Sequence, residues 1–184
     1  MKNIRLEWDG PYNLDDIGYV KGKYTYDEEK FIDELNQENR DYGIYQAYGS
    51  HPVYGNNVLL YIGKAAQQTF AKRLSQEGWE YNQDAKNIQF YVGRLFIIDN
   101  EEQPNNEIWN DMIDKAERML IHAHEPARNS SNILNITKNT DKLKEFETIR
   151  IFNYDSYKSL IPEISGELWV KEFNNSNVFI WDGK

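Results

Sequence analysis

The sequence predicts an α+β fold for a chain of 184 residues. Alternating apolar residues indicate several short strands, and apolar residues at three- and four-residue spacing indicate helices. These elements lack the regular strand–helix–strand order of a parallel α/β protein. We expect residues 1–184 to form a single domain, because a chain of this length can bury one substantial hydrophobic core.

The first half of the chain is expected to contain a strand, a short helix and a hairpin. Apolar and polar residues alternate in residues 4–8, which indicates an opening strand. A short helix is expected at residues 28–35. Two further strands, at residues 43–45 and 59–64, are expected to form a long-looped hairpin, because turn-forming residues separate them: Gly49, Pro52, Gly55, Asn56 and Asn57.

Two helices and three strands are expected in the second half. Apolar residues recur every four positions around residues 69–76, which indicates a helix. A longer helix with an apolar stripe is expected at residues 107–123, ended by Pro126. The strands are expected at residues 88–98, 149–152 and 178–181.

The composition is that of a water-soluble globular protein, with 40% hydrophobic residues. No apolar run approaches the roughly 20 residues that a membrane-spanning helix needs, so we expect no membrane partner. The first residues are charged and lack the apolar core of a secretory signal, so a cytoplasmic protein is expected. The absence of cysteine excludes disulfides, thiolate metal sites and cysteine nucleophiles.

The charge is unevenly distributed along the acidic chain, whose formal net charge is -9. Residues 42–76 contain no Asp or Glu and include Lys64, Lys72 and Arg73, whereas residues 7–41 are rich in acids. The net charge argues against general coating of nucleic acid, which depends on Lys and Arg. The basic segment could still bind a polyanion locally, although chance segregation on a solvated surface explains it equally well.

The two hairpin strands allow a geometric prediction, because side chains alternate between the faces of a strand. If Ile44, Leu60 and Ile62 share one face, Tyr45 and Tyr61 share the other. Gly63 would then let the backbone turn closely into Lys64 and the next helix.

Two charged residues are expected at the edges of apolar helix faces. Arg73 follows Phe70 by three positions, and Glu117 follows Ile113 by four. An unpaired carboxylate at such a place is costly, so Glu117 needs a partner. Arg73, a metal ion or both would supply it.

Taken together, these segments resemble the GIY-YIG nuclease superfamily over roughly residues 41–135. Gly43-Ile44-Tyr45 and Tyr61-Ile62-Gly63 match the two motifs that name the family, and Arg73 stands at the family's usual helix position. Residues 116–121 resemble the family's closing helix, which carries a metal-binding Glu, here Glu117, and is followed by an Asn, here Asn129. Residues 1–40 and 136–184 would be extensions packing on this core, as on small stand-alone bacterial members.

The resemblance implies a small, mostly antiparallel β-sheet flanked by helices. It also implies DNA strand cleavage assisted by one divalent metal ion, Mg²⁺ or Mn²⁺. Glu117 would hold the metal, and Arg73 would bind the scissile phosphate and stabilise its charge. Tyr45 or Tyr61 would position or deprotonate the attacking water, helped by Lys64, since a free tyrosine has a pKa near 10. Lys64, Arg73 and Asn129 would contact the substrate. One carboxylate suffices because Mg²⁺ retains water ligands.

One position departs from the family pattern. Many members place a histidine one helical turn after the arginine, where this chain has Glu77. Such a carboxylate would repel the phosphate, so Glu77 either turns away, changes metal binding or impairs catalysis. His51 is expected in the hairpin loop, and His122 and His124 point in different directions on a helix, so they are not expected to share a metal.

Each of these residues also has an ordinary structural interpretation. Tyr45 and Tyr61 could be strand aromatics, Arg73 and Glu117 a structural ion pair, Lys64 a solvated lysine and Asn129 a turn residue. Their joint order favours the nuclease site.

Three functions therefore remain open. A metal-dependent DNA endonuclease, of the restriction or genome-defence kind, is the leading hypothesis, and a homodimer would let it cut both strands. A catalytically degenerate module that binds nucleic acid or a protein is the second, motivated by Glu77 and the acidic composition. A ribonuclease is less favoured, because nothing identifies a group that contacts a 2′-hydroxyl.

Overall fold

The structure is a computed structural model. The structure describes residues 2–21, 23, 25–38, 42–79, 86–98, 106–127 and 144–168. The predicted strand at residues 178–181 lies outside these ranges, as does Asn129. Among the described residues, no helix combines the length and the apolar character needed to cross a membrane.

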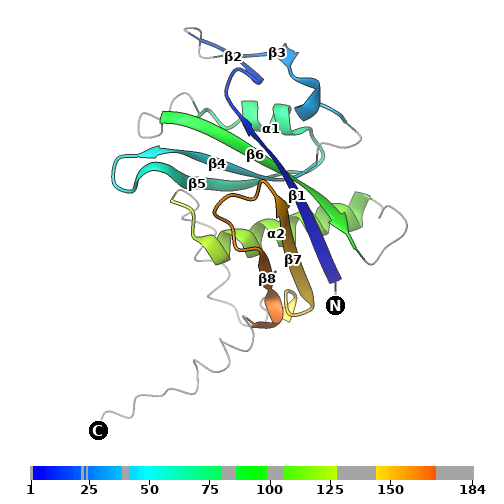
Figure 1. Ribbon diagram of the computed structural model, residues 1–184. Helices are drawn as coiled ribbons and strands as arrows, with labels where there is room; N and C mark the ends of the chain where they lie inside the picture. The colour runs from blue at the N-terminus through cyan, green and yellow to red at the C-terminus, as the bar shows by residue number, and fades with distance from the viewer. Residues whose placement is uncertain are drawn as a thin grey trace.

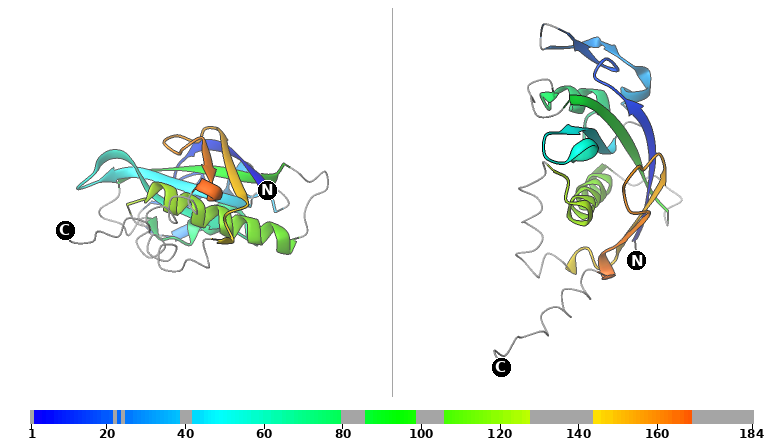
Figure 2. Two further views of the ribbon diagram at one scale, coloured as in Figure 1. Left: turned by 90° about the horizontal axis from the view of Figure 1, so that it is seen from below. Right: turned by 60° about the vertical axis from the view of Figure 1, so that its left-hand side comes forward.

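A mostly antiparallel, curled β-sheet organises the described chain (Figures 1 and 2). The strand order is β5-β4-β6-β1-β7-β8, and a separate two-stranded sheet joins β2 to β3. The α+β class and the mostly antiparallel sheet are as predicted. The elements are β1 (Lys2–Tyr12), β2 (Ile17–Val20), β3 (Thr25–Phe31), a 3-10 turn (Asp33–Leu35), β4 (Gly43–His51), β5 (Gly55–Ala65), α1 (Phe70–Ser75), β6 (Lys86–Ile97), α2 (Asn106–His124), β7 (Ile149–Asp155) and β8 (Glu163–Ser165).

The N-terminal strand lies inside the main sheet rather than at its margin. β1 pairs with β6 in antiparallel fashion and with β7 in parallel fashion. Ile4, Leu6 and Trp8 point to one face and are at most 2% exposed, which confirms the predicted opening strand. The segment before residue 41 therefore contributes a structural strand between the hairpin region and the C-terminal strands.

Two of the predicted elements are wrong. Residues 28–31 belong to β3, which pairs with β2 and brings Tyr26 against Tyr19, so only residues 33–35 of the predicted short helix are helical, as a 3-10 turn. The hairpin loop is also short, because the strands continue to His51 and restart at Gly55. Several turn-forming residues therefore lie within the strands, where Asn57 adopts a positive φ of 55° beside a register shift.

The two helices pack on opposite faces of the β4–β5 hairpin, with α1 above and α2 below it in Figure 1. Ile44 and Tyr48 of β4 belong to the hydrophobic cluster that includes α2. Tyr45 and Ala47 belong to the cluster that includes α1. Because neighbouring side chains on a strand point to opposite faces, both faces of β4 are buried in cores.

A β-bulge at Leu60 changes which side chains of β5 share a face. Ala47 pairs with Tyr61 and Tyr48 pairs with Leu59, so Leu60 has no partner on β4. Leu60 consequently joins the α1 cluster, while Ile62 stays in the α2 cluster with Ile44. The predicted common face of Leu60 and Ile62 is thus wrong, since strict alternation ends at a bulge.

Candidate functional site

Tyr45 and Tyr61 lie on the same face of the hairpin, as the alternation predicts. Their rings stack with centroids 6.0 Å apart. The indole of Trp79 stands edge-on to both rings, at 6.5 Å from Tyr45 and 5.9 Å from Tyr61. Tyr45 is fully buried, whereas Tyr61 is partly exposed. These three aromatic rings form the floor of the candidate site on the α1 side.

Gly63 provides the space into which the Tyr45 hydroxyl projects. A Cβ atom at position 63 would lie 2.4 Å from the Tyr45 hydroxyl oxygen and 2.7 Å from Cε1 of Tyr61. The strand continues through Gly63 to Ala65, so the predicted turn at this glycine is wrong. The absence of a side chain at Gly63 leaves room for the rings of Tyr45 and Tyr61.

Replacing Gly63 by alanine is expected to lower the free energy of unfolding by about 1–3 kcal/mol, the usual cost of overpacking a core. The added methyl group would push Tyr45 away from its present position, because the ring is buried on all sides. Urea denaturation followed by tryptophan fluorescence measures the change.

A double-mutant cycle with Tyr45→Phe provides the control. Removing the hydroxyl relieves part of the clash, so the two substitutions should cost less together than the sum of their separate costs. Additive costs would show that Gly63 does not act through Tyr45.

Glu77 connects Tyr45 to Arg73. The Tyr45 hydroxyl donates a hydrogen bond of 3.0 Å to Oε1 of Glu77, and the Arg73 guanidinium forms an ion pair with the same oxygen. Burial and the Glu77 charge raise the pKa of Tyr45 far above its usual value. Glu77 therefore faces the site, which decides against the option that it turns away.

Arg73 also ties α1 to the end of β5. Its Nε donates a hydrogen bond of 3.2 Å to the main-chain carbonyl of Lys64. The side chain is 29% exposed, as expected for the edge of the apolar face that contains Phe70. Arg73 thus links the hairpin face that contains Tyr45 and Tyr61 to Lys64, whose side chain points to α2.

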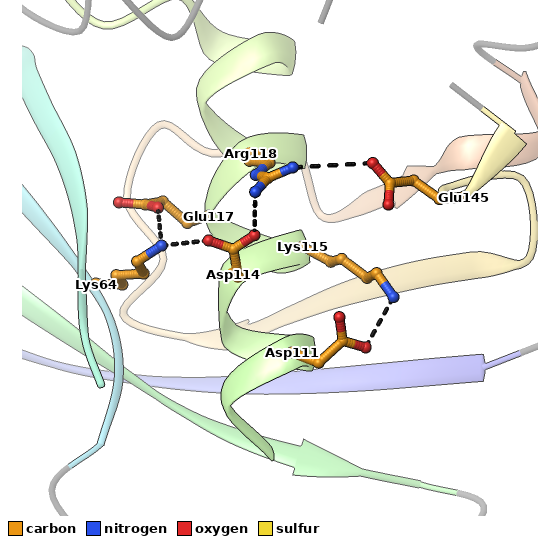
Figure 3. A network of polar contacts seen from close by, with 7 residues as sticks. All are labelled: Lys64, Asp111, Asp114, Lys115, Glu117, Arg118 and Glu145. Atoms are coloured by element: carbon orange, nitrogen blue, oxygen red, sulfur yellow. Dashed lines mark hydrogen bonds and ion pairs between the residues drawn. The ribbon is translucent and has the colours of Figure 1, made fainter. Parts of the chain in front are cut away.

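Lys64 lies between two carboxylates of α2 (Figure 3). Its ammonium contacts Oδ1 of Asp114 and lies 3.0 Å from Oε2 of Glu117. Arg118 binds the other oxygen of Asp114 and extends toward Glu145. The predicted partner of Glu117 was Arg73 or a metal ion, but the direct partner among the described residues is Lys64.

The pKa values of this cluster reflect competition between burial and charge. Burial raises the pKa of Glu117 above its usual value, although Lys64 acts in the opposite direction. Burial lowers the pKa of Lys64, but the hydrogen bond to Asp114 and the charge of Glu117 outweigh it, so the net shift is upward. Lys64 is therefore a cation, and it only partly offsets the cost of burying Glu117.

Two of the three basic residues in the segment at residues 42–76 pair with carboxylates, whereas Lys72 is exposed. Lys64 meets Asp114 and Glu117, and Arg73 meets Glu77. The local charge pattern of the sequence therefore overstates the positive charge that this region presents to a polyanion. Any anionic substrate has to compete with these carboxylates.

A continuous series of contacts links Tyr61, Tyr45, Glu77, Arg73, Lys64 and Glu117. Sequence reasoning missed Asp114, although its position three residues before Glu117 places it on the same helix face. His124 lies elsewhere and accepts a hydrogen bond of 2.8 Å from the Ile161 amide. His51 stacks on Tyr54 at the hairpin tip.

Comparison of the chain with protein-family models, curated proteins and solved structures found no significant match. A function for this site therefore has to be argued from its residues and their geometry.

Proposed function

We propose that the protein is a metal-dependent DNA endonuclease that hydrolyses phosphodiester bonds at the site around Arg73 and Glu117. The observation that carries the proposal is the contact series from Tyr45 through Glu77 and Arg73 to Lys64 and Glu117. These residues come from β4, β5, α2, α1 and the segment just after α1. An arginine, a lysine and a carboxylate within one network are the groups that phosphoryl transfer requires.

The chemistry of Glu117 suits a divalent cation, because a carboxylate supplies the oxygen ligand that Mg²⁺ prefers. Glu117 is a carboxylate whose side chain is only 11% exposed, and its burial is incompletely offset by Lys64. Among the described residues no group of three or more His, Asp or Glu is arranged to hold a metal, but Mg²⁺ needs few protein ligands because it keeps water molecules. Glu117 would hold the ion, which would polarise a phosphate oxygen and offset its charge.

Arg73 and Lys64 would meet the phosphate. Both now pair with carboxylates, and the five N–H donors of a guanidinium allow Arg73 to bind a phosphate oxygen as well as Glu77. The planar guanidinium of Arg73 suits two phosphate oxygens at once, whereas Lys64 supplies a single positive charge. The positive charges of Arg73 and Lys64 both act to lower the pKa of Tyr61. Burial has the larger effect, so the pKa is raised.

Incubation with negatively supercoiled plasmid DNA tests this function. We expect nicked or linear DNA to form with Mg²⁺ or Mn²⁺ and no conversion with EDTA, because the phosphate charge needs the metal. Gel electrophoresis at several times gives the rate.

An Arg73→Ala protein purified in the same way is the control. Its rate should fall by about 10³-fold, the size reported for removal of a charge-stabilising arginine. Equal cleavage by both proteins would assign the activity to a contaminant and refute the proposal.

A second candidate function is binding of DNA without cleavage. The ion pair between Arg73 and Glu77 favours it, because it occupies the guanidinium that a nuclease would offer to phosphate. Fluorescence anisotropy with labelled duplex DNA, combined with the plasmid assay, separates the two functions. Binding without turnover in every metal supports the second candidate.

A further inference from the structure

The proposed reaction needs a deprotonated group that takes a proton from the attacking water. Neither Tyr45 nor Tyr61 is such a group. Tyr45 is fully buried, and its hydroxyl donates a hydrogen bond to Glu77. Tyr61 is partly exposed, but burial and the charges of Glu77 and Glu117 raise its pKa. A general base has to be deprotonated and within reach of the water. Both tyrosines instead hold their protons at neutral pH.

Glu77 is a carboxylate that is held in an ion pair with Arg73 and is open to water. Its Oε1 receives the Tyr45 hydroxyl and the Arg73 guanidinium. Both of these contacts are made to Oε1. The side chain is 19% exposed, so water reaches it. One oxygen thus fixes the carboxylate, and the other is available to accept a proton.

We propose that Glu77 is the general base of this site, with Tyr45 acting as a positioning residue that holds the carboxylate. The inference rests on the proposed nuclease function and goes beyond it. It assigns to a carboxylate the role that the sequence resemblance gives to a tyrosine. Arg73 joins base and substrate, because the guanidinium that would bind the phosphate already contacts Glu77.

The chemical step balances without a further reactant. A water molecule gives one proton to Oε2 of Glu77 while its oxygen forms a bond to phosphorus. The bond from phosphorus to the leaving sugar oxygen breaks, and that oxygen takes a proton from solvent. The products are a phosphate monoester end and a free hydroxyl end.

A set of three variants tests the proposal in the plasmid assay. Glu77→Gln keeps an oxygen that accepts from Tyr45 and Arg73 but cannot take a proton, so cleavage should fall by about 10²- to 10⁴-fold. Glu77→Asp keeps the carboxylate and should remain more active than Glu77→Gln. Tyr45→Phe removes one hydrogen bond to the carboxylate and should slow cleavage by about tenfold or less.

The pH profile of the wild-type protein gives a second readout that needs no variant. The groups facing Glu77 are Arg73, Tyr45 from β4 and Tyr61 from β5. With a carboxylate base, which is ionised at neutral pH, the single-turnover rate should change little between about pH 7 and pH 9. With a tyrosine base, whose pKa is near 10 or higher, the rate should rise about tenfold per pH unit over the same range.

Several outcomes would overturn the proposal, and thermal melting of each variant shows that it is folded. Unchanged cleavage by Glu77→Gln would remove Glu77 from the reaction while leaving the nuclease function intact. Faster cleavage by this variant would identify Glu77 as a shield over Arg73. A rate that rises with pH and is lost in Tyr45→Phe would make Tyr45 the base. Absence of cleavage by the wild-type protein in every metal would refute the nuclease function itself, and the base with it.

Discussion

Glu117→Gln is expected to lower metal-dependent DNA cleavage by about 10³-fold, which corresponds to roughly 4 kcal/mol of lost transition-state stabilisation. Glutamine has nearly the same shape as glutamate but carries no charge to bind Mg²⁺. The Glu117 side chain is 11% exposed, and its carboxylate contacts Lys64. The plasmid assay measures the rate, and titration with Mn²⁺ followed by electron paramagnetic resonance measures metal binding directly.

The same substitution should leave the protein folded. Burial already disfavours the charged form of Glu117, and Lys64 keeps its contact with Asp114 after the change. We therefore expect a melting temperature equal to that of the wild-type protein or higher.

The control is Asp111→Asn on the same helix. Asp111 pairs with Lys115 across one turn, and its side chain is 47% exposed, away from Lys64 in Figure 3. This variant should cleave DNA at the wild-type rate. If Asp111→Asn and Glu117→Gln reduced the rate equally, the effect would come from the total charge of α2 rather than from a metal ligand.

Trp8→Ala is expected to lower the free energy of unfolding by about 3–5 kcal/mol, the usual range for removing a buried aromatic side chain. Trp8 is 2% exposed, and its indole fills the space over Gly93, where a Cβ would lie 2.9 Å from the ring. Its Nε1 donates a buried hydrogen bond of 2.8 Å to Asn153. The substitution thus opens a cavity and leaves a buried amide oxygen without its donor. Urea denaturation followed by circular dichroism measures the loss.

Tyr154→Ala is the matched control, because Tyr154 is an aromatic residue of β7 that is 46% exposed. A surface substitution of this kind usually changes stability by about 0.5 kcal/mol or less. A small effect at Trp8 would mean that β1 is a peripheral decoration. A large effect would make the N-terminal segment part of the structural core.

Strong periodicity was enough to predict the strand at Ile4–Trp8, the hairpin strands and the long helix α2. The segment at residues 28–35 was mispredicted, because its acidic residues suit either a helix surface or an exposed strand. Pairing with β2 decides in favour of the strand, and that pairing is a tertiary contact that local spacing does not contain.

The places of several candidate residues were predictable, but their pairings were not. Tyr45 and Tyr61 follow from alternation, and Glu117 from its place at the edge of an apolar helix face. The partner of Glu117 depends on Lys64 crossing from β5 to α2, and the orientation of Glu77 depends on the gap above Gly63. Both features depend on packing between residues far apart in the chain, which local sequence patterns do not contain.

The place of β1 in the sheet also determines how late in synthesis the sheet can form completely. Ile4 finds its two partners at Ile97 and Ile151, so the first strand has to wait for most of the chain to be made. Long-range pairings of this kind slow folding, because the entropy of closing a long loop is lost before the contact forms. Until β7 is available, the stripe of Ile4, Leu6 and Trp8 stays exposed on the nascent chain, where it is open to chaperones and to aggregation.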